Sequence, residues 1–399
     1  MALTSLDEAR TQILKVLNPL GPEEVQLEDA FGRTLFEPIV ALRTLPPWDN
    51  SAMDGYALSL GETATRLKIV EKIFAGETPK IELVAGTCAR IMTGAPMPRG
   101  AGAVVPQEKT RSLEGDEVEL LELPTAGAHV RRRGEDVQQG ALLFPAGREL
   151  GVADAGSLWG QGLERVTVRK RPRVAIVSSG DELCDVGAVV DGKIVDTNSP
   201  VIAALVRRAG GLPTQIGRAA DSLESLTALI ARGLEFDVLI TLAGASVGEK
   251  DFTQAALTGL GVQIDFWKVA MKPGKPLVFG RRGQTLVFGL PGNPVSAMVT
   301  FELFVRPALR ALQNLEPVQA HLPARVGAAI EKQPGLRLFV RATWEVRGTE
   351  LWATPLASQS SGALSSASGA TCLIEVPEAS GKLEIGSHCK MLPVSWRPA

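Results

Sequence analysis

The chain has 399 residues, of which 45% are hydrophobic and 22% charged, and its 42 basic and 44 acidic residues give a formal net charge of −2. This near-balance excludes nucleic-acid and membrane-surface partners that are held by bulk positive charge. No apolar run approaches the roughly 18 residues expected of a membrane span. Because the chain is longer than one hydrophobic core usually supports, about two to four domains are expected.

The cysteines and histidines are too scattered for metal or nucleophilic chemistry of the usual kinds. No two cysteines form the CxxC pair typical of a zinc site, and their spacing does not resemble a dense disulfide framework. The first twenty residues lack the basic segment and apolar run of a secretory signal. These features favour a cytoplasmic protein. The residues concerned are Cys88, Cys184, Cys372, Cys389, His129, His321 and His388.

The N-terminal part of the chain predicts a helix followed by a β-rich module. The helix spans residues 5–17, where Ser5 and Glu8 form a capping box ahead of an apolar stripe. Between about residues 41 and 140, glycine and proline are frequent and the apolar runs are short. This composition is typical of a small module of short strands.

Strand-like and helix-like segments alternate between about residues 172 and 315. Such alternation predicts a doubly wound, mostly parallel sheet. The last helix begins at Pro294 and is expected to bend near Pro307. The other expected elements are strands at Val174–Val177, Thr214–Gly217 and Phe236–Leu242, helices at Ser199–Gly210, at Leu223–Leu234 and from Asp251, and a hairpin of Leu277–Phe279 with Thr285–Phe288.

After about residue 319 the sequence again alternates as strands do. Residues 335–396 predict a small β-barrel or sandwich, with a turn at Arg347–Thr349. The serine-rich stretch Ser358–Ser368 has the composition of a flexible linker. The strand-like sequence on both sides of it favours a surface loop instead.

Three short loops between residues 178 and 297 carry the strongest functional signal. Each follows a predicted strand and precedes a helical pattern, so all three should line the ligand crevice at the carboxyl edge of the sheet. Glycine lets the backbone approach a phosphate closely, and helix N-termini favour anions. The sequence therefore predicts a site for a phosphorylated small molecule. The loops are Ser178–Leu183, Gly244–Asp251 and Gly289–Ala297.

Acidic side chains accompany these loops. Glu182, Asp221 and Asp251 each follow a predicted strand of the same sheet. Carboxylates gathered without histidine or thiolate favour Mg²⁺, which typically bridges substrate phosphates. The alternative is helix capping, and it fits Asp221 best because Asp221 and Glu224 have the spacing of a capping box.

Two lysines flank a short proline-rich turn. Lys272 and Lys275 lie three residues apart between Met271 and Pro276, and the prolines restrict the backbone between them. Fixed ammonium groups of this kind suit a phosphate or another oxyanion. A solvated charged turn is the alternative.

Taken in order, these motifs resemble those of the molybdopterin molybdotransferase family, which comprises bacterial MoeA proteins and the gephyrin E domain. The resemblance runs from about residue 5 to residue 396. It rests on Asp49–Ala57, Thr93–Ala95, Gly134–Asp136, Ser179–Leu183, Ser246–Gly248, Lys272–Pro276 and Gly289–Ala297.

The resemblance implies an α/β multidomain fold and a homodimer. The implied domains are a doubly wound, mostly parallel sheet domain that binds molybdopterin (5–21 and 171–318), a small linking domain (22–40 and 141–170), an inserted β-rich module (41–140) and a C-terminal β-barrel (319–399). The active cleft is expected to be closed by the module of the partner subunit.

The implied reaction is insertion of molybdate into the dithiolene of adenylylated molybdopterin. AMP leaves when the pyrophosphate bond is cleaved with Mg²⁺ as cofactor. The implied partners are adenylylated molybdopterin, molybdate and a second copy of the chain, with other enzymes of molybdenum cofactor biosynthesis as candidates. No nucleic-acid or membrane partner is expected.

The family's functional positions fall on named residues of this chain. The implied catalytic residues include two acids of the β-rich module, Asp54 and Asp136, which read alone would be polar turn residues. The others are Glu182, Asp221, Asp251 and Lys275, with Glu182 and Asp251 as the Mg²⁺ ligands. The implied substrate-binding residues are Ser179, Gly180, Asp181, Gly244, Ser246, Gly248, Lys272, Pro276, Pro291, Gly292, Asn293, Pro294, Ser296, Arg341 and Ser366.

The chain departs from the family at Leu242 and Ala243, where a serine and a glycine are usual. Either the strand is one residue longer here or substrate contact is weaker. Two other functions compete with the implied one: a molybdopterin adenylyltransferase, which needs only the sheet domain, and a non-catalytic scaffold related to the gephyrin E domain.

Overall fold

The fold was analysed in a computed structural model, which describes residues 3–59, 61–242, 252–394 and 396. The chain forms two compact units. The first unit contains residues 1–36, 149–151 and 165–399, and the second contains residues 37–148 and 152–164. Each unit has its own hydrophobic clusters.

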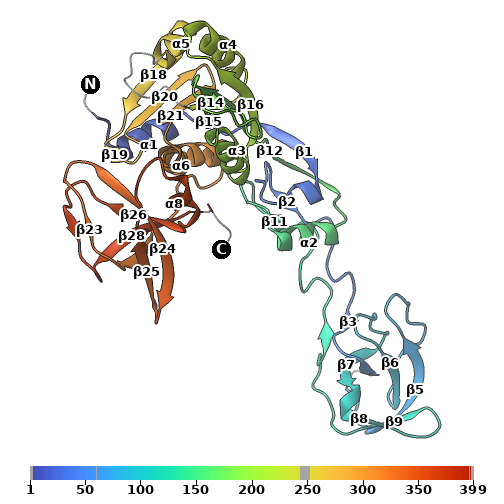
Figure 1. The fold of residues 1–399 in the computed structure, drawn as a ribbon. Coiled ribbons are helices and arrows are strands. Elements are labelled where there is room, and N and C mark those ends of the chain that lie inside the picture. The colour runs from blue at the N-terminus through green and yellow to red at the C-terminus, as the bar shows by residue number, and fades with distance from the viewer. Residues whose placement is uncertain (1–2, 60, 243–251, 395, 397–399) are drawn as a thin grey trace. The chain divides into compact units, whose positions relative to one another are not determined.

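The centre of the first unit is a six-stranded sheet in the order β16-β13-β17-β21-β20-β18 (Figure 1). The first four strands are parallel, whereas β20 is antiparallel to both β21 and β18. The predicted doubly wound, mostly parallel sheet and the predicted hairpin are therefore confirmed. The strands are β13 (Arg173–Ser179), β16 (Leu212–Ala219), β17 (Val238–Leu242), β18 (Gln263–Lys268), β20 (Pro276–Arg282) and β21 (Thr285–Leu290).

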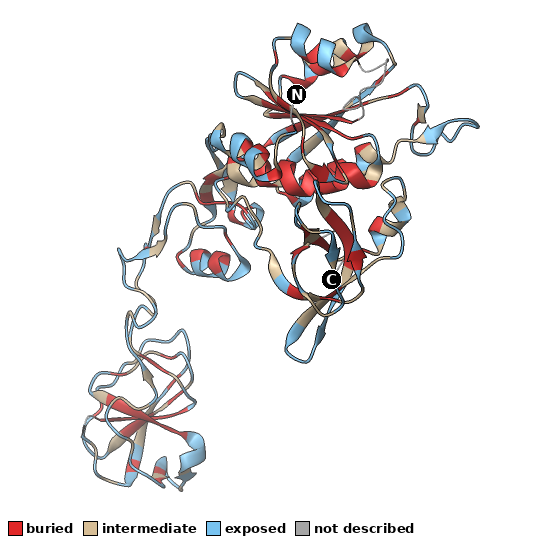
Figure 2. Ribbon diagram, turned by 90° about the vertical axis from the view of Figure 1, so that its left-hand side faces the viewer, coloured by how far each residue is buried: buried red, intermediate tan, exposed pale blue. Residues whose placement is uncertain are grey.

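Helices cover both faces of this sheet because successive strand residues point to opposite sides. In β17, Val238 and Ile240 pack with one set of helices, whereas Leu239 packs with the other. The buried residues are accordingly concentrated along the strands and the adjoining helices (Figure 2). One face carries α1 (Leu6–Lys15), α3 (Asn198–Arg208), α6 (Pro294–Thr300) and α7 (Arg306–Leu312), and the other carries α4 (Leu223–Gly233) and α5 (Thr253–Gly259).

Helix starts agree with the sequence at both α1 and α4, but the residue that caps α4 differs from the alternative offered for Asp221. The Ser5 hydroxyl accepts from the Glu8 amide at 3.2 Å, and the Glu8 carboxylate accepts from the Ser5 amide at 3.0 Å. At α4 the N-cap is Ser222, whose hydroxyl accepts from the Ser225 amide. The capping box expected of Asp221 and Glu224 is wrong, because Asp221 lies one residue before the cap.

The helix that begins at Pro294 is interrupted before Pro307. After α6 it continues as a π-helical turn, η3 (Phe301–Val305), and then as α7. Pro307 has no amide hydrogen to donate to the carbonyl four residues earlier, so the regular hydrogen-bond ladder cannot run through it. The predicted irregularity thus takes the form of a widened turn just ahead of the proline.

The C-terminal part of the first unit is a closed five-stranded barrel, as predicted. Its strands follow the order β24-β25-β22-β28-β26, and pairing of β26 with β24 closes it. A short strand, β19 (Met271–Lys272), pairs with β24 and ties the lysine turn to the barrel. The barrel strands are β22 (Leu322–Val326), β24 (Arg337–Arg347), β25 (Glu350–Pro355), β26 (Cys372–Val376) and β28 (His388–Pro393).

The serine-rich stretch of the barrel is only partly a loop, because its end forms the short helix α8 (Leu364–Ser368). The first unit is completed by paired short strands: β1 (Pro22–Gln26) with β12 (Arg165–Arg169), β14 (Leu183–Cys184) with β15 (Ile194–Val195), and β23 (Ile330–Glu331) with β27 (Lys382–Leu383). A 3-10 turn, η1 (Leu27–Asp29), follows β1.

The second unit is rich in short strands, as expected. Its six-stranded sheet has the order β7-β4-β6-β5-β9-β8. The sheet comprises β4 (Gly55–Ser59), β5 (Arg66–Ile73), β6 (Thr87–Ile91), β7 (Ala101–Pro106), β8 (Thr110–Ser112) and β9 (Glu117–Leu120), with η2 (Gln107–Lys109) between β7 and β8. The unit also contains β2 (Ile39–Val40) paired with β11 (Leu142–Phe144), β3 (Asn50–Ser51) paired with β10 (Val130–Arg131), and α2 (Val152–Gly160).

In the part of the chain that the structure describes, no helix combines the length and the apolar character needed to span a membrane.

Candidate functional site

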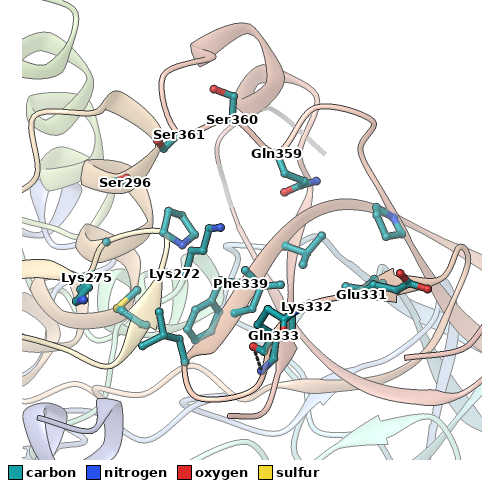
Figure 3. A pocket seen from close by; sticks show the side chains of 18 of the residues that line it. Lys272, Lys275, Ser296, Glu331, Lys332, Gln333, Phe339, Gln359, Ser360 and Ser361 are labelled. Atoms are coloured by element: carbon teal, nitrogen blue, oxygen red, sulfur yellow. Dashed lines mark hydrogen bonds between the residues drawn. The ribbon is translucent and has the colours of Figure 1, made fainter. Parts of the chain in front are cut away.

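Two adjoining cavities lie in the first unit. The larger, about 980 Å³, is called here the lysine cavity because Lys272 and Lys275 line it (Figure 3). The smaller, about 550 Å³, is called the strand-end cavity because its lining includes the carboxyl ends of β13 and β17 and the residues that follow β21. Pro276 lines both cavities. The crevice that open α/β sheets use for ligands is therefore present and has two compartments.

The lysines stand on either side of a tightly anchored turn. Lys272 belongs to β19, which pairs with β24, and the Lys275 carbonyl accepts from the Val269 amide at 2.9 Å. Gly274 between them has a φ of +99°, and a Cβ there would lie 2.5 Å from the Thr300 methyl. Only glycine fits such a position. The turn thus holds two ammonium groups at the cavity, and no ion pair to either lysine is found among the described residues.

Only some of the remaining predicted oxyanion contacts lie at the cavity. Ser296 lies in the first turn of α6, is 5% exposed and lines the lysine cavity. Arg341 and Ser366 do not line it. The Arg341 guanidinium is fully buried and donates to the carbonyls of Ser358 and Ser360, both at 3.0 Å. The Ser366 hydroxyl donates to the Ala363 carbonyl at 2.6 Å.

The strand-end cavity collects several predicted pterin and nucleotide contacts. Its lining includes Ser179, Pro291, Gly292, Asn293 and Pro294. Pro291, Gly292 and Asn293 form the turn that precedes the N-terminus of α6, where amide dipoles favour an anion. The local chemistry suits a phosphate group.

Glu182 supplies one carboxylate of the strand-end cavity. Gly180 makes room for it, because its φ is +140° and a Cβ there would lie 2.6 Å from Glu182 Oε2. The neighbouring acids, Asp181 and Asp221, are joined to each other by a hydrogen bond within the loops. The Asp181 carboxylate accepts from the Asp221 amide at 3.2 Å. Of these three acids, only Glu182 lines the cavity.

The donor set is compatible with Mg²⁺. This ion usually binds through one or two carboxylates together with substrate phosphates and water, so a site with few protein ligands suffices. Glu182 meets that need beside a phosphate-compatible turn. Over the described ranges there is no group of three or more histidine, cysteine, aspartate or glutamate side chains that would form an all-protein metal cage.

Sequence reasoning missed the wall contributed by α3. The Asp196 carboxylate accepts from the amide and the hydroxyl of Ser199, and the Asn198 side chain donates to the Gly292 carbonyl at 2.7 Å. Asp196, Thr197 and Asn198 all line the strand-end cavity. The sequence feature that could have identified this wall is the polar triplet Asp196, Thr197 and Asn198, which directly precedes a predicted helix of the sheet domain.

Asp54 and Asp136 lie in the second unit. Asp54 is exposed, and one of its oxygens accepts from the Thr93 amide at 2.7 Å and from the Thr93 hydroxyl at 2.8 Å. These hydrogen bonds, the amide first, lower the pKa of Asp54. Asp136 is also exposed, and its amide donates to the Leu45 carbonyl at 3.1 Å.

Four predicted site residues, Gly244, Ser246, Gly248 and Asp251, lie outside the described residues. The unusual Leu242 just before them can be placed. It is the last residue of β17, pairs with Ser178 and Leu290, and is 2% exposed. Leu242 therefore belongs to the strand, as the first of the two interpretations expects, and it also lines the strand-end cavity.

Comparisons with known proteins agree along the whole chain. Three family models match it: "MoeA N-terminal region (domain I and II)" over residues 4–162, "Probable molybdopterin binding domain" over residues 175–311, and "MoeA C-terminal region (domain IV)" over residues 323–394. The chain is 37% identical over 392 residues to "Molybdopterin molybdenumtransferase 2" of Mycobacterium tuberculosis, covering 94% of this chain and 96% of that one.

Two further likenesses point the same way. The "Molybdopterin molybdenumtransferase" of Bacillus subtilis is 32% identical over 400 residues, which cover 97% of this chain and 93% of that one. A solved structure of the "molybdopterin biosynthesis moea protein" from Pyrococcus horikosii superposes with a TM-score of 0.82 at 30% identity, and all of both chains is covered.

Proposed function

The chain belongs to the molybdopterin molybdenumtransferase family of enzymes in molybdenum cofactor biosynthesis, and we propose that it inserts molybdate into adenylylated molybdopterin with release of AMP. One observation carries the proposal: a cavity with two ammonium groups adjoins a phosphate-compatible cavity at the carboxyl ends of the sheet strands.

The lysine cavity is the proposed molybdate site. Lys272 and Lys275 offer two positive charges to a dianion, and the Ser296 hydroxyl adds a hydrogen-bond donor from the base of α6. Hydrogen bonds between charged groups are roughly twice as strong as neutral ones. Because the turn is anchored, little backbone order must be gained when the anion binds.

The strand-end cavity is the proposed site for the pyrophosphate of adenylylated molybdopterin. The turn at Gly292 and Asn293 would orient the phosphates, and Glu182 with Asp251 would hold Mg²⁺. When bound, Mg²⁺ would neutralise charge on the pyrophosphate while water cleaves the bond to AMP. The shared wall at Pro276 would bring the dithiolene end of the pterin beside the oxyanion.

We also propose that the active enzyme is a homodimer in the cytoplasm. Asp54 and Asp136 would then serve the cleft of the partner subunit, as the family resemblance implies. The exposed carboxylates of these two residues suit an electrostatic or hydrogen-bonding role toward substrate.

The two competing functions make different predictions. A molybdopterin adenylyltransferase would consume molybdopterin and ATP with Mg²⁺ in the absence of molybdate. A scaffold would bind its partner but turn over no substrate. The family matches to the N-terminal and C-terminal regions, in addition to the sheet domain, favour the molybdate-inserting enzyme.

Release of AMP from purified adenylylated molybdopterin tests the proposal directly. With Mg²⁺ and molybdate present, we expect molybdenum cofactor and AMP to form together, and Lys275→Gln to lower the rate at least about tenfold by removing a charged contact. Lys332→Gln is the matched control, because Lys332 lines the same cavity but its ammonium donates to the Gln333 and Glu378 carbonyls. Equal rates in all three proteins would overturn the proposal.

A further inference from the structure

The segment Ser358–Ser361 forms the barrel-side wall of the lysine cavity. Figure 3 shows Gln359, Ser360 and Ser361 on this segment, and all three line the cavity with Lys272 and Lys275. The wall faces the same space as the proposed molybdate contacts. A polar group on it is therefore available to a ligand held by the lysines.

Arg341 fixes this wall from behind. Its guanidinium donates to the carbonyls of Ser358 and Ser360, and its backbone exchanges two hydrogen bonds with the Gln359 amide group at 3.0 and 2.9 Å. Four hydrogen bonds to a fully buried residue leave the segment little freedom. Side chains on the segment are thus held in place before a ligand binds.

Ser361 is anchored from the sheet side as well. Its carbonyl accepts from the Val295 amide at 3.2 Å, and its hydroxyl oxygen accepts from the Asn293 side-chain amide at 3.2 Å. A hydroxyl has one hydrogen to donate and two lone pairs. Within the described part of the chain, no hydrogen bond donated by the Ser361 hydroxyl is found. Its hydrogen is free for a ligand, and acceptance from Asn293 polarises it.

We propose that Ser361 is a further oxyanion-binding residue, whose hydroxyl donates to a tetrahedral dianion held by Lys272 and Lys275. This inference rests on the proposed function, because it takes the lysine cavity as the molybdate site. The hydrogen bond is charge-assisted, which makes it shorter and stronger than a bond to a neutral acceptor. Asn293 acts here as the residue that positions the hydroxyl.

Ser368 provides a matched contrast in the same stretch of sequence. Its hydroxyl hydrogen is already donated to the Ser365 carbonyl at 2.7 Å, and it does not line the lysine cavity. The two serines therefore differ in the one property that matters, a free donor at the cavity.

The test is calorimetric binding of molybdate to the full-length chain. We expect Ser361→Ala to weaken binding by about 10- to 100-fold, as is typical when a hydrogen bond to a charged group is lost. Ser361→Thr keeps the hydroxyl and should restore affinity to within about fivefold of the unaltered protein, and Ser368→Ala should bind as the unaltered protein does. Thermal unfolding should change little in Ser361→Ala, because the contact to Val295 is made by the backbone and the lost hydrogen bond from Asn293 is an exposed one.

Two outcomes separate this inference from the proposed function. If Lys275→Gln weakens binding but Ser361→Ala does not, the inference is overturned and the molybdate site stands. If the unaltered protein does not bind molybdate, both fail. A crystal of the unaltered protein soaked with molybdate gives a second reading. An oxyanion oxygen about 2.5–2.7 Å from Ser361 Oγ supports the inference, and a separation beyond hydrogen-bonding reach contradicts it.

Discussion

The positions of Lys272 and Lys275 at the cavity depend on the turn between them, and in particular on Gly274. An ammonium on a four-carbon stem is a mobile charge, and it becomes part of a site only when its backbone is fixed. Here the fixing comes from β19 on one side, from the contact with the Val269 amide on the other, and from the close approach of Gly274 to Thr300. The spacing of the lysines could be predicted from the sequence, whereas the steric requirement for glycine at position 274 could not.

Replacing Gly274 should therefore harm the site and the fold together. Gly274→Ala places a Cβ 2.5 Å from the Thr300 methyl at a φ of +99°, so we expect the free energy of unfolding to fall by about 2–4 kcal/mol. Chemical denaturation measures the change. Gly283→Ala isolates the conformational part, because Gly283 also has a positive φ but a Cβ there would meet no heavy atom within 4 Å, and it should lose only about 1–2 kcal/mol. Equal losses would rule out the close contact as the cause.

The charge on Asp54 is also set by a neighbour. Thr93→Val removes the hydroxyl that donates to Asp54 and keeps the larger contribution from the Thr93 amide. We expect the pKa of Asp54 to rise part of the way toward its usual value, as followed by NMR titration of the carboxyl carbon. Thr93→Ser should restore the low pKa. A pKa that is the same in the valine variant would mean that the hydroxyl does not stabilise the carboxylate.

Elements with a strong pattern were the ones that sequence reasoning placed well. The capping box of α1, the alternation of the central sheet and the β20–β21 hairpin each depend on local spacing, and each was found. The start of α4 at Leu223 was also found, but its cap was not, because Asp221 and Ser222 are both good caps and the choice depends on where β16 ends. The pinning of Ser358–Ser361 by Arg341 joins residues that are well separated along the chain, so no local pattern could predict it.

The π-helical turn carries a buried acid. Glu302 is 7% exposed, accepts from the Trp396 indole at 3.0 Å and lies 3.8 Å from the Arg306 guanidinium. Burial raises the pKa of Glu302, and these two partners only partly offset the effect. An acid whose pKa is higher in the folded state favours folding below its unfolded pKa. This contribution is lost as the pH rises toward the folded value.

Glu302→Gln should consequently change the pH dependence of stability. The amide oxygen can still accept from Trp396, but the group no longer ionises. Calorimetry measures the melting temperature of the variant minus that of the unaltered protein. We expect this difference to become more positive as the pH is raised from about 4.5 to about 8. Glu345→Gln, at an exposed ion pair with Arg347, should show no such trend. A difference between Glu302→Gln and the unaltered protein that does not vary with pH would contradict the assigned burial effect.

At the scale of the whole molecule, the first unit is assembled from both ends of the chain. The Arg337 guanidinium donates to both carboxylate oxygens of Asp7, at 3.1 and 2.9 Å, and so joins α1 to the barrel. β19 joins the lysine turn to the same barrel strand. The family resemblance predicted a barrel after the sheet domain. It placed two residues of the barrel domain, Arg341 and Ser366, among the substrate contacts. It did not indicate that Gln359, Ser360 and Ser361 would line the lysine cavity, because the relevant contacts are not local in sequence.

Mixed dimers test the proposal that two subunits build one cleft. Asp54→Asn and Lys275→Gln should each be nearly inactive alone. Random mixing during co-expression should make about half of the dimers mixed. If Asp54 serves the partner's lysine cavity, each mixed dimer holds one intact cleft of two, because the Asp54→Asn chain keeps its own Lys275 and receives Asp54 from its partner. The mixture should then show about a quarter of the normal AMP release. No recovery in a mixture that contains both chains would contradict a shared cleft.

The central claim is that the lysine cavity holds the oxyanion, and anomalous diffraction at the molybdenum edge tests it most directly. Crystals soaked with molybdate should show an anomalous peak within hydrogen-bonding reach of Lys272 and Lys275, and the peak should be missing from crystals of Lys275→Gln. A peak elsewhere, or an empty lysine cavity at saturating molybdate, would contradict the account.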